Sequence, residues 1–173
     1  MVKFFADIVW ILSSLAPYYI FFILSKKSFF DEKILFIPTY ILIVLLIGIS
    51  CLLTKMAIHY FYKNKSEDTL LVSNIKPAEA TYVPLYISYF IIAIGIDSLI
   101  VFEICSLLLI VLIYKTKIYY FNPIVYFFNY NFYEVVSDKG VSFLVISKQK
   151  NLKQIKEFNN LCRLNNFSFI DRG

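Results

Sequence analysis

The chain has 173 residues, of which 60% are hydrophobic and only 17% are charged, and its formal net charge is +5 at pH 7. A soluble domain is roughly half apolar and about a quarter charged, so this composition excludes an ordinary water-soluble globule. The mean hydropathy of +0.70 indicates instead an integral membrane protein, with apolar residues collected in blocks that can cross a bilayer.

The first apolar block runs from Phe4 to Leu24. It is longer than the core of a typical secretory signal, and the following Lys26-Lys27-Ser28-Phe29 lacks a small-x-small cleavage pattern, so we expect the block to be retained as a membrane span. Asp7 lies near the cytoplasmic end of this span, where it could reach the interface or meet Lys3 one turn before it. Asp7 is therefore a candidate intramembrane polar contact.

Further segments with the length and polarity of a membrane span are 34–53, 80–96 and 98–114. Read as one helix, residues 80–114 would be about 52 Å long, far beyond a hydrocarbon core of about 30 Å. The sequence therefore predicts a hairpin over residues 95–98, with Asp97 or Ser98 capping the last helix. Kinks are expected at the two prolines that lie inside spans, Pro17 and Pro84.

The last span contains a second intramembrane acid, Glu103. Ser106 follows it at three-residue spacing, so the two side chains form a polar patch that should face other helices rather than lipid. Two interpretations stay open: an interhelical hydrogen bond near the outer interface, or the lining of a pore or sensing site.

The lysines that flank the spans predict the orientation of the bundle. With four spans, one side carries Lys3, Lys55, Lys63, Lys65, Lys76, Lys115 and Lys117, whereas the other side carries Lys26, Lys27 and Lys33. Because basic residues concentrate in short cytoplasmic flanks, both termini are predicted to lie in the cytoplasm.

Two segments next to the spans have a mixed aromatic and polar composition. Residues 55–79 are expected to extend the second helix, turn, and run along the membrane surface. Residues 118–130 are expected to form an aromatic interfacial elbow with a short helix, because Asn122 is a good N-cap and Pro123 suits the first helical position.

Residues 131–173 are predicted to form a small cytoplasmic ββαβ domain. Two β-rich runs, 132–136 and 141–146, flank a turn in which Gly140 can take the left-handed conformation. Asn151 can start an amphipathic helix that ends near Asn165-Asn166, and residues 167–170 resemble a third strand. The predicted fold class is thus a mostly α membrane protein, a four-transmembrane-helix bundle over 1–117 with spans near 4–24, 34–53, 80–96 and 98–114, an elbow over 118–130, and this ββαβ domain.

The predicted tail helix has a basic face, formed with the two lysines before it by Lys148, Lys150, Lys153, Lys156 and Arg163. Three interpretations remain open: a solvated face, contact with anionic lipid headgroups at about 1 kcal/mol per basic residue, or docking of a cytoplasmic partner. Direct nucleic-acid binding is disfavoured, because lysines that flank the membrane account for most of the net charge.

The sequence offers little for catalysis, metals or cofactors. His59 is the single histidine, and four glycines leave little room for a phosphate-binding loop. Cys51, Cys105 and Cys162 are far apart and lie mostly in apolar runs, so they are interpreted as packing residues. We therefore predict a protein that is not an enzyme, with no catalytic residues, metal or cofactor.

One part of the chain is similar to a known family. Asn122-Pro123, Asn129-Tyr130, Phe132-Tyr133-Glu134-Val135, Gly140 and Leu144 to Ser147, together with four spans before a short tail, resemble the membrane subunit of the bacterial Kiwa anti-phage defence system. Asn129 departs from the pattern, since a glycine is expected before the tyrosine.

The resemblance implies a homo-oligomeric sensor or scaffold in the bacterial inner membrane, which responds to phage attack and recruits a cytoplasmic DNA-binding effector protein. Two alternatives come from other classes. One is a small pore-forming, holin-like membrane effector whose channel is lined by Glu103 and Ser106, and the other is an accessory subunit of a transporter or lipid-processing complex.

Overall fold

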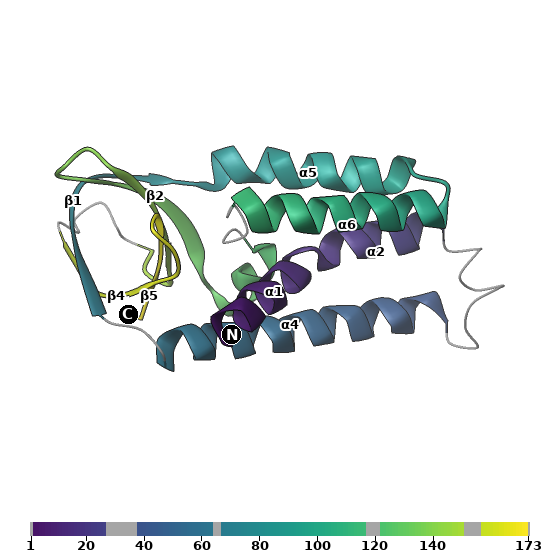
Figure 1. Ribbon diagram of the computed structural model, residues 1–173, viewed down its shortest axis with the longest axis horizontal. Coiled ribbons are helices and arrows are strands. Elements are labelled where there is room, and N and C mark those ends of the chain that lie inside the picture. The colour runs from purple at the N-terminus through teal and green to yellow at the C-terminus, as the bar shows by residue number, and fades with distance from the viewer. Residues whose placement is uncertain (1, 27–37, 64–66, 117–121, 151–156, 173) are drawn as a thin grey trace.

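The computed structural model describes residues 2–26, 38–63, 67–116, 122–150 and 157–172. A bundle of helices occupies one end of the elongated molecule and a β-barrel occupies the other (Figure 1). The helices of the bundle are α1 (Val2–Ser14), α2 (Ala16–Ser25), α4 (Thr39–Lys63), α5 (Glu79–Gly95) and α6 (Leu99–Thr116). The N-terminus lies at the end of the bundle that faces the barrel (Figure 1).

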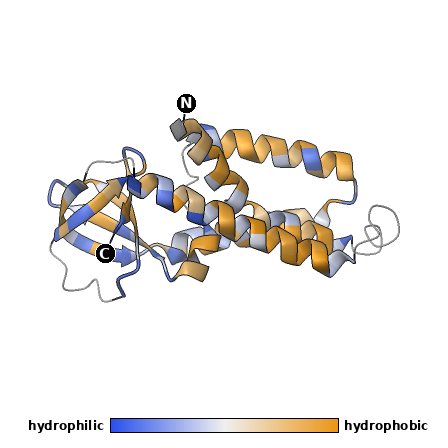
Figure 2. Ribbon diagram, turned by 90° about the horizontal axis from the view of Figure 1, so that it is seen from below, coloured by the Kyte–Doolittle hydropathy of each residue, from blue (hydrophilic) through white to orange (hydrophobic). Residues whose placement is uncertain are grey.

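Within the described residues, three helical stretches are long and apolar enough to cross a membrane: Phe4–Ser25, Thr39–Lys63 and Leu99–Thr116. The helix α5 is apolar but has only 17 residues, so at about 1.5 Å per residue it falls somewhat short of a hydrocarbon core. The chain is therefore a membrane protein by the length and composition of its helices, and the predicted count of four spans is not confirmed. Hydrophobic residues dominate the helices, whereas the barrel contains both hydrophobic and hydrophilic residues (Figure 2).

Of the kinks predicted at the two prolines, the one at Pro17 coincides with a break between helices, whereas α5 continues through Pro84. Helices α1 and α2 are separated at Leu15, with Pro17 in the first turn of α2. Pro84 lies inside α5, where its carbonyl accepts a hydrogen bond from the Ser88 hydroxyl at 2.9 Å. The hairpin between α5 and α6 is confirmed, and the Ser98 hydroxyl oxygen accepts from the Val101 amide at 3.5 Å as the cap of α6.

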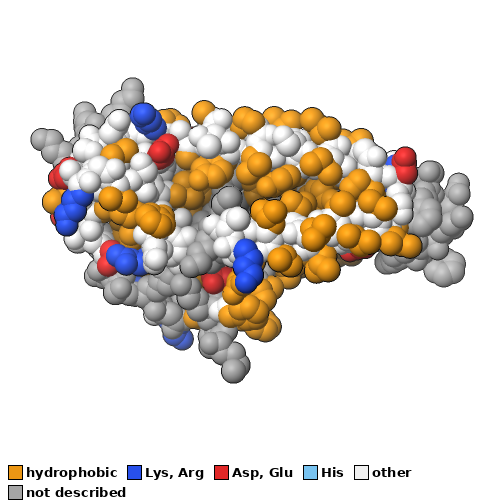
Figure 3. All heavy atoms as spheres, turned by 45° about the horizontal axis from the view of Figure 1, so that its top comes forward, with side chains coloured by type: hydrophobic (Ala, Val, Ile, Leu, Met, Phe, Trp, Pro, Cys, Tyr) orange, Lys and Arg blue, Asp and Glu red, His pale blue; other side chains and the backbone are white. Residues whose placement is uncertain are grey.

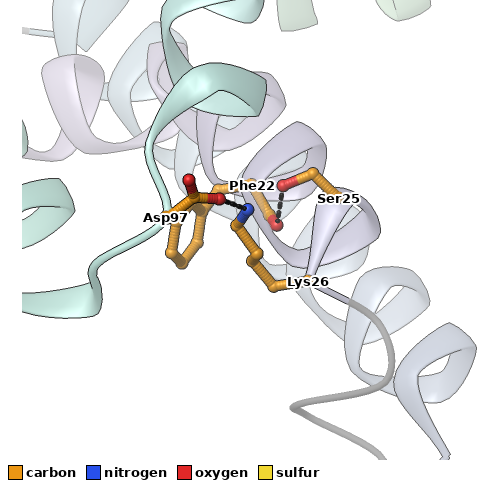
Figure 4. A network of polar contacts seen from close by, with 4 residues as sticks. All are labelled: Phe22, Ser25, Lys26 and Asp97. Carbon is orange, nitrogen blue, oxygen red and sulfur yellow. Dashed lines mark hydrogen bonds and ion pairs between the residues drawn. The ribbon is translucent and has the colours of Figure 1, made fainter.

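An ion pair joins two loops at the end of the bundle far from the barrel. The Lys26 ammonium donates to the Asp97 carboxylate at 2.5 Å, and the Phe22 carbonyl accepts from the Ser25 hydroxyl beside it (Figure 4). The hydrogen bond and the charge of Lys26 lower the pKa of the Asp97 carboxyl from its usual value. Asp97 therefore ties the α5–α6 hairpin to the end of α2, while Ser98 caps α6.

The predicted elbow contains a short 3₁₀ helix, η2 (Pro123–Phe128). Asn122 is its N-cap, as predicted, and Asn129 follows it with a left-handed φ of 61°. Asparagine tolerates this conformation better than other non-glycine residues, which explains why it can stand where the family resemblance predicts glycine. Residues 118–121 lie outside the described part of the chain.

The barrel is closed and has five strands: β1 (Glu67–Pro77), β2 (Asn131–Ser137), β3 (Ser142–Ser147), β4 (Glu157–Arg163) and β5 (Ser168–Asp171). Around the barrel the order is β1-β2-β3-β5-β4, and all pairs are antiparallel except β3 with β5. One half of β1 pairs with β4, from Glu67 opposite Cys162, and the other half pairs with β2, up to Pro77 opposite Tyr133. Irregularities in both registers let this long strand bend and close the barrel.

The ββαβ prediction for the tail is wrong where it places a helix, and it lacks the strand that comes from residues 67–77. The strands β2, β3 and β5 and the turn at Gly140, with φ of 76°, are confirmed. Residues 157–163, predicted as helix, form the strand β4, because pairing on both sides satisfies their backbone. Residues 67–77, expected to run along the membrane surface, form β1, so the barrel takes a strand from the predicted transmembrane domain. The start of the predicted helix, 151–156, lies outside the described residues.

Candidate functional site

Bundle and barrel meet in one continuous apolar core. Trp10 of α1 and Phe61 of α4 are fully buried and contact each other edge to face, with ring centroids 5.7 Å apart. The same cluster contains Val125 of η2, Phe132 of β2 and Ile146 of β3, all buried. Burying side chains of this size stabilises the junction by roughly 1.5–3 kcal/mol each, so the barrel is fixed to the helices rather than tethered.

A polar network joins the end of α4 to the barrel. The Tyr62 and Tyr130 hydroxyls lie 2.8 Å apart, and the Tyr62 hydroxyl donates to the Asp171 carbonyl at 3.1 Å. The Asp171 carboxylate, in β5, accepts from the Ser147 hydroxyl at 2.7 Å and from the Gln149 amide at 3.1 Å. A helix end, the elbow and two strands are thereby connected through hydrogen bonds.

Basic side chains cover this network. Arg172 donates from its guanidinium to the Tyr62 carbonyl, and the Lys148 ammonium lies 4.8 Å from the centre of the Tyr130 ring. Lys150 is exposed just beyond Lys148. The barrel therefore presents cations next to the end of α4, on the side that the lysine count predicts to be cytoplasmic.

The predicted basic face is only partly where the sequence placed it. Lys148 and Lys150 lie after β3, whereas Arg163 lies on β4 and pairs with Asp68 of β1, with its Nε 2.9 Å from Oδ2. The pair bridges the two strands that close the barrel. Because Arg163 lies in a strand, it is not part of the predicted helical basic face. Lys153 and Lys156 are outside the described residues.

Buried polar residues also connect the elbow to the bundle. The Asn122 side chain is fully buried, and its amide donates to the Ser13 hydroxyl at 2.8 Å and to the Thr54 hydroxyl at 3.4 Å. Its carbonyl oxygen accepts from the Ile124 amide at 2.9 Å. One side chain thus caps η2 and binds both α1 and α4.

The intramembrane candidates have different environments. Asp7 is buried in α1, and the side chain of its predicted neighbour Lys3 lies outside the described part. Ser106 is buried in α6, and its hydroxyl donates to the Phe102 carbonyl at 2.8 Å. Glu103 is exposed on the surface of the single chain, so its contact with another copy stays a prediction.

A cavity of about 470 Å³ lies between the bundle and the barrel. Its walls come from the start of α5, the last residue of α6, the strands β2 and β3, and the turn between β4 and β5. It is a concave site at the junction that the sequence did not indicate. Among the described residues, no group of three or more histidine, cysteine or acidic side chains could hold a metal ion.

A comparison with protein families decides the affiliation of the chain. The model of a family described as the anti-phage protein KwaA matches residues 6–170, which run from within α1 to within β5 and include every element between them. The chain belongs to the KwaA family. Membership gives it a role in anti-phage defence and confirms the resemblance carried by the elbow and the first tail strands. No curated protein and no solved structure matches it.

The sequence missed most of the contacts that define the junction of this KwaA-family chain. Tyr62 and Asp171 are 109 residues apart in the sequence, and Tyr130 lies between them. The three residues come together because the barrel closes. Asn122 was recognised as a helix cap, but its bonds to α1 and α4 were not. An asparagine that lies among aromatic residues shortly after a span is the signal that could have suggested a structural role beyond capping.

Proposed function

We propose that this chain is a non-enzymatic membrane sensor and scaffold of an anti-phage defence system. It oligomerises in the bacterial inner membrane, and its barrel recruits a cytoplasmic DNA-binding effector protein. The observation that carries the proposal is a closed barrel fixed rigidly to a membrane bundle, with Lys148 and Arg172 beside the junction. The Tyr62, Tyr130 and Asp171 contacts and the shared apolar core join the two parts. Family membership supports the defence role.

The proposed orientation places both termini and the barrel in the cytoplasm. It rests on the seven lysines counted on that side against three on the other. A cysteine introduced at Lys150, which is exposed, should resist an impermeant thiol reagent in intact cells and react after lysis. Labelling in intact cells would reverse the orientation.

The proposed oligomer covers the exposed acid of α6. Glu103 lies among exposed apolar side chains that include Ile100, Ile104 and Leu107, and a carboxylate facing lipid costs a few kcal/mol even near an interface. Contact with another copy removes that exposure. Glu103→Gln should keep the fold and change oligomer stability, whereas an unchanged oligomer in Glu103→Leu would make the residue incidental.

The recruitment experiment is a pull-down of the candidate effector from detergent-solubilised membranes. Reversing the charges of Lys148 and Lys150 should weaken capture, most clearly at low salt where a Debye length of about 10 Å or more leaves the attraction unscreened. The matched control is Lys139→Glu, because Lys139 is exposed in the turn at the opposite end of β3. Equal loss in the control would point to net charge rather than to a docking face.

A truncation after the last span is not a suitable control. Ending the chain at Lys117 removes four strands and leaves β1 without its partners β2 and β4. The point substitutions keep the barrel closed, so undiminished capture by the reversed variant would refute docking at Lys148 and Lys150.

The second candidate function is a small pore, and the exposed Glu103 is the observation that favours it. Several copies of α6 could surround a channel with this side chain. Liposomes that contain the purified protein alone separate the two functions, because a pore conducts ions without a partner and a scaffold does not. An accessory role in a transporter complex has no comparable support in the described contacts.

A further inference from the structure

The cavity between bundle and barrel has the size and position of a ligand site. Its volume of about 470 Å³ falls in the range of about 300–1,000 Å³ that is usual for small-molecule pockets. Thr81 and Tyr82 line it from the first turn of α5, and Thr116 lines it from the end of α6. Since these are the ends of apolar helices, the cavity lies at the level of lipid headgroups.

The chemistry of the lining favours a cation with polar groups attached. Among the described lining residues Glu134 is the one that carries a charge, and the other polar side chains are hydroxyls and amides, among them Ser142 and Asn165. Phe143 and Phe167 add stacked aromatic rings with centroids 6.3 Å apart. A carboxylate and aromatic faces attract an ammonium group, while hydroxyl and amide donors can bind phosphate oxygens.

Glu134 is available for such a ligand. It is exposed, and it forms no ion pair with any residue in the described part of the chain, although Lys76 is its partner in the register of β1 and β2.

Apolar helix surface continues from the cavity into the membrane. Val83 and Ile87 on α5 are 43% and 49% exposed, and Leu108 and Leu112 on α6 are 62% and 56% exposed. On α6, Leu108 and Leu112 lie eight and four residues before Thr116 of the cavity, so the three residues share one side of the helix. Hydrophobic side chains cover this part of the molecule, and charged ones lie mainly over the barrel end (Figure 3). Acyl chains can follow this surface while a headgroup occupies the cavity.

We propose that the cavity binds the headgroup of a zwitterionic, amine-bearing phospholipid of the ethanolamine class, with its acyl chains along α5 and α6. Glu134 binds the ammonium group, and the hydroxyl and amide side chains bind the phosphate. The site discriminates against purely anionic lipids, because none of its described lining residues is a lysine or arginine. The inference is independent of the proposed scaffold function.

The test is native mass spectrometry of the full-length protein from micelles that contain equal amounts of an ethanolamine and a glycerol phospholipid. We expect the ethanolamine lipid to be retained preferentially, and Glu134→Gln to lower its retention about tenfold, since a hydrogen bond to a charged group contributes about 1.5 kcal/mol or more. The matched control is Asp138→Asn, which removes one exposed acid from the same barrel outside the cavity. A second variant, Ser142→Phe, should lower retention by filling the cavity without changing charge.

Two further measurements test whether the bound amine belongs to a lipid and whether each variant is folded. Soluble phosphoethanolamine should compete with the lipid only weakly, because it cannot use the apolar surface of α5 and α6. Fluorescence of the buried Trp10 should confirm that each variant retains its folded bundle. Equal retention of the two lipids, or the same loss in Glu134→Gln and Asp138→Asn, would overturn the proposal. Competition by free phosphoethanolamine as strong as that by the lipid would refute the lipid source.

Discussion

Asn122 is expected to be among the most sensitive polar residues at the junction, and Asn122→Ala tests this directly. Its side chain is fully buried and makes three hydrogen bonds, to the Ser13 hydroxyl, the Thr54 hydroxyl and the Ile124 amide. Losing the cap of η2 costs about 1 kcal/mol, and losing the 2.8 Å bond to Ser13 costs about 1 kcal/mol more. The bond to Thr54 is long at 3.4 Å and adds less. The expected total is about 2–3 kcal/mol.

The chain offers an internal probe for this measurement. Trp10 is its only tryptophan, is fully buried, and contacts Phe61 at the same end of the bundle. Unfolding of the detergent-solubilised protein by added sodium dodecyl sulfate can therefore be followed by tryptophan fluorescence. A double-mutant cycle with Ser13→Ala should give a coupling energy of about 1 kcal/mol. A coupling of zero, or a loss below about 0.5 kcal/mol in Asn122→Ala, would show that the buried amide does not hold the elbow to the bundle.

Further predictions concern the elbow, the barrel and the far end of the bundle. Asn129→Gly should leave stability nearly unchanged, whereas Asn129→Val should cost about 1–3 kcal/mol, because a β-branched residue is strained at φ of 61°; equal unfolding midpoints would contradict this. Glu67→Cys should form a disulfide with Cys162 on oxidation, since their Cα positions pair in the closed barrel, and absence of the crosslinked peptide would argue against closure by β1 and β4. Asp97→Asn should reduce stability near neutral pH, because the folded-state pKa of Asp97 is lowered by Lys26. This difference should disappear as the pH falls through that lowered value, below the usual 3.8, and persistence in acid would refute the assignment.

Features set by a few neighbouring residues were predictable from the sequence. Ser98 caps α6, Asn122 caps η2, and Gly140 takes a left-handed turn between β2 and β3, because each depends on backbone groups within three or four residues. The membrane-spanning character of the long apolar blocks was equally predictable, since it depends only on their composition and on their length relative to the thickness of a bilayer.

The strand β4 shows where local patterns fail. Phe158 and Cys162 are four residues apart and match a helical stripe, yet they lie in a strand whose neighbours are β1 and β5. Phe158 packs inside the barrel and Cys162 joins the core shared with the bundle, so both are buried, as the residues of a helical stripe would also be expected to be. Hydrophobic spacing alone could not separate the two structures. The decisive contribution is backbone pairing with residues 67–71, about ninety positions earlier in the chain.

The strand β1 explains why the division of the chain at residue 117 describes the function incompletely. Three residues separate it from the end of α4 and one residue separates it from the start of α5, so both of its ends are anchored to helices of the bundle. In the barrel it pairs with β2 and β4, strands that follow the last span. A change in the relative position of α4 and α5 therefore acts directly on the strand that closes the barrel. The protein is proposed to sense events at the membrane and to present a docking face on the barrel. For this function β1 connects the bundle to the barrel more directly than the elbow does.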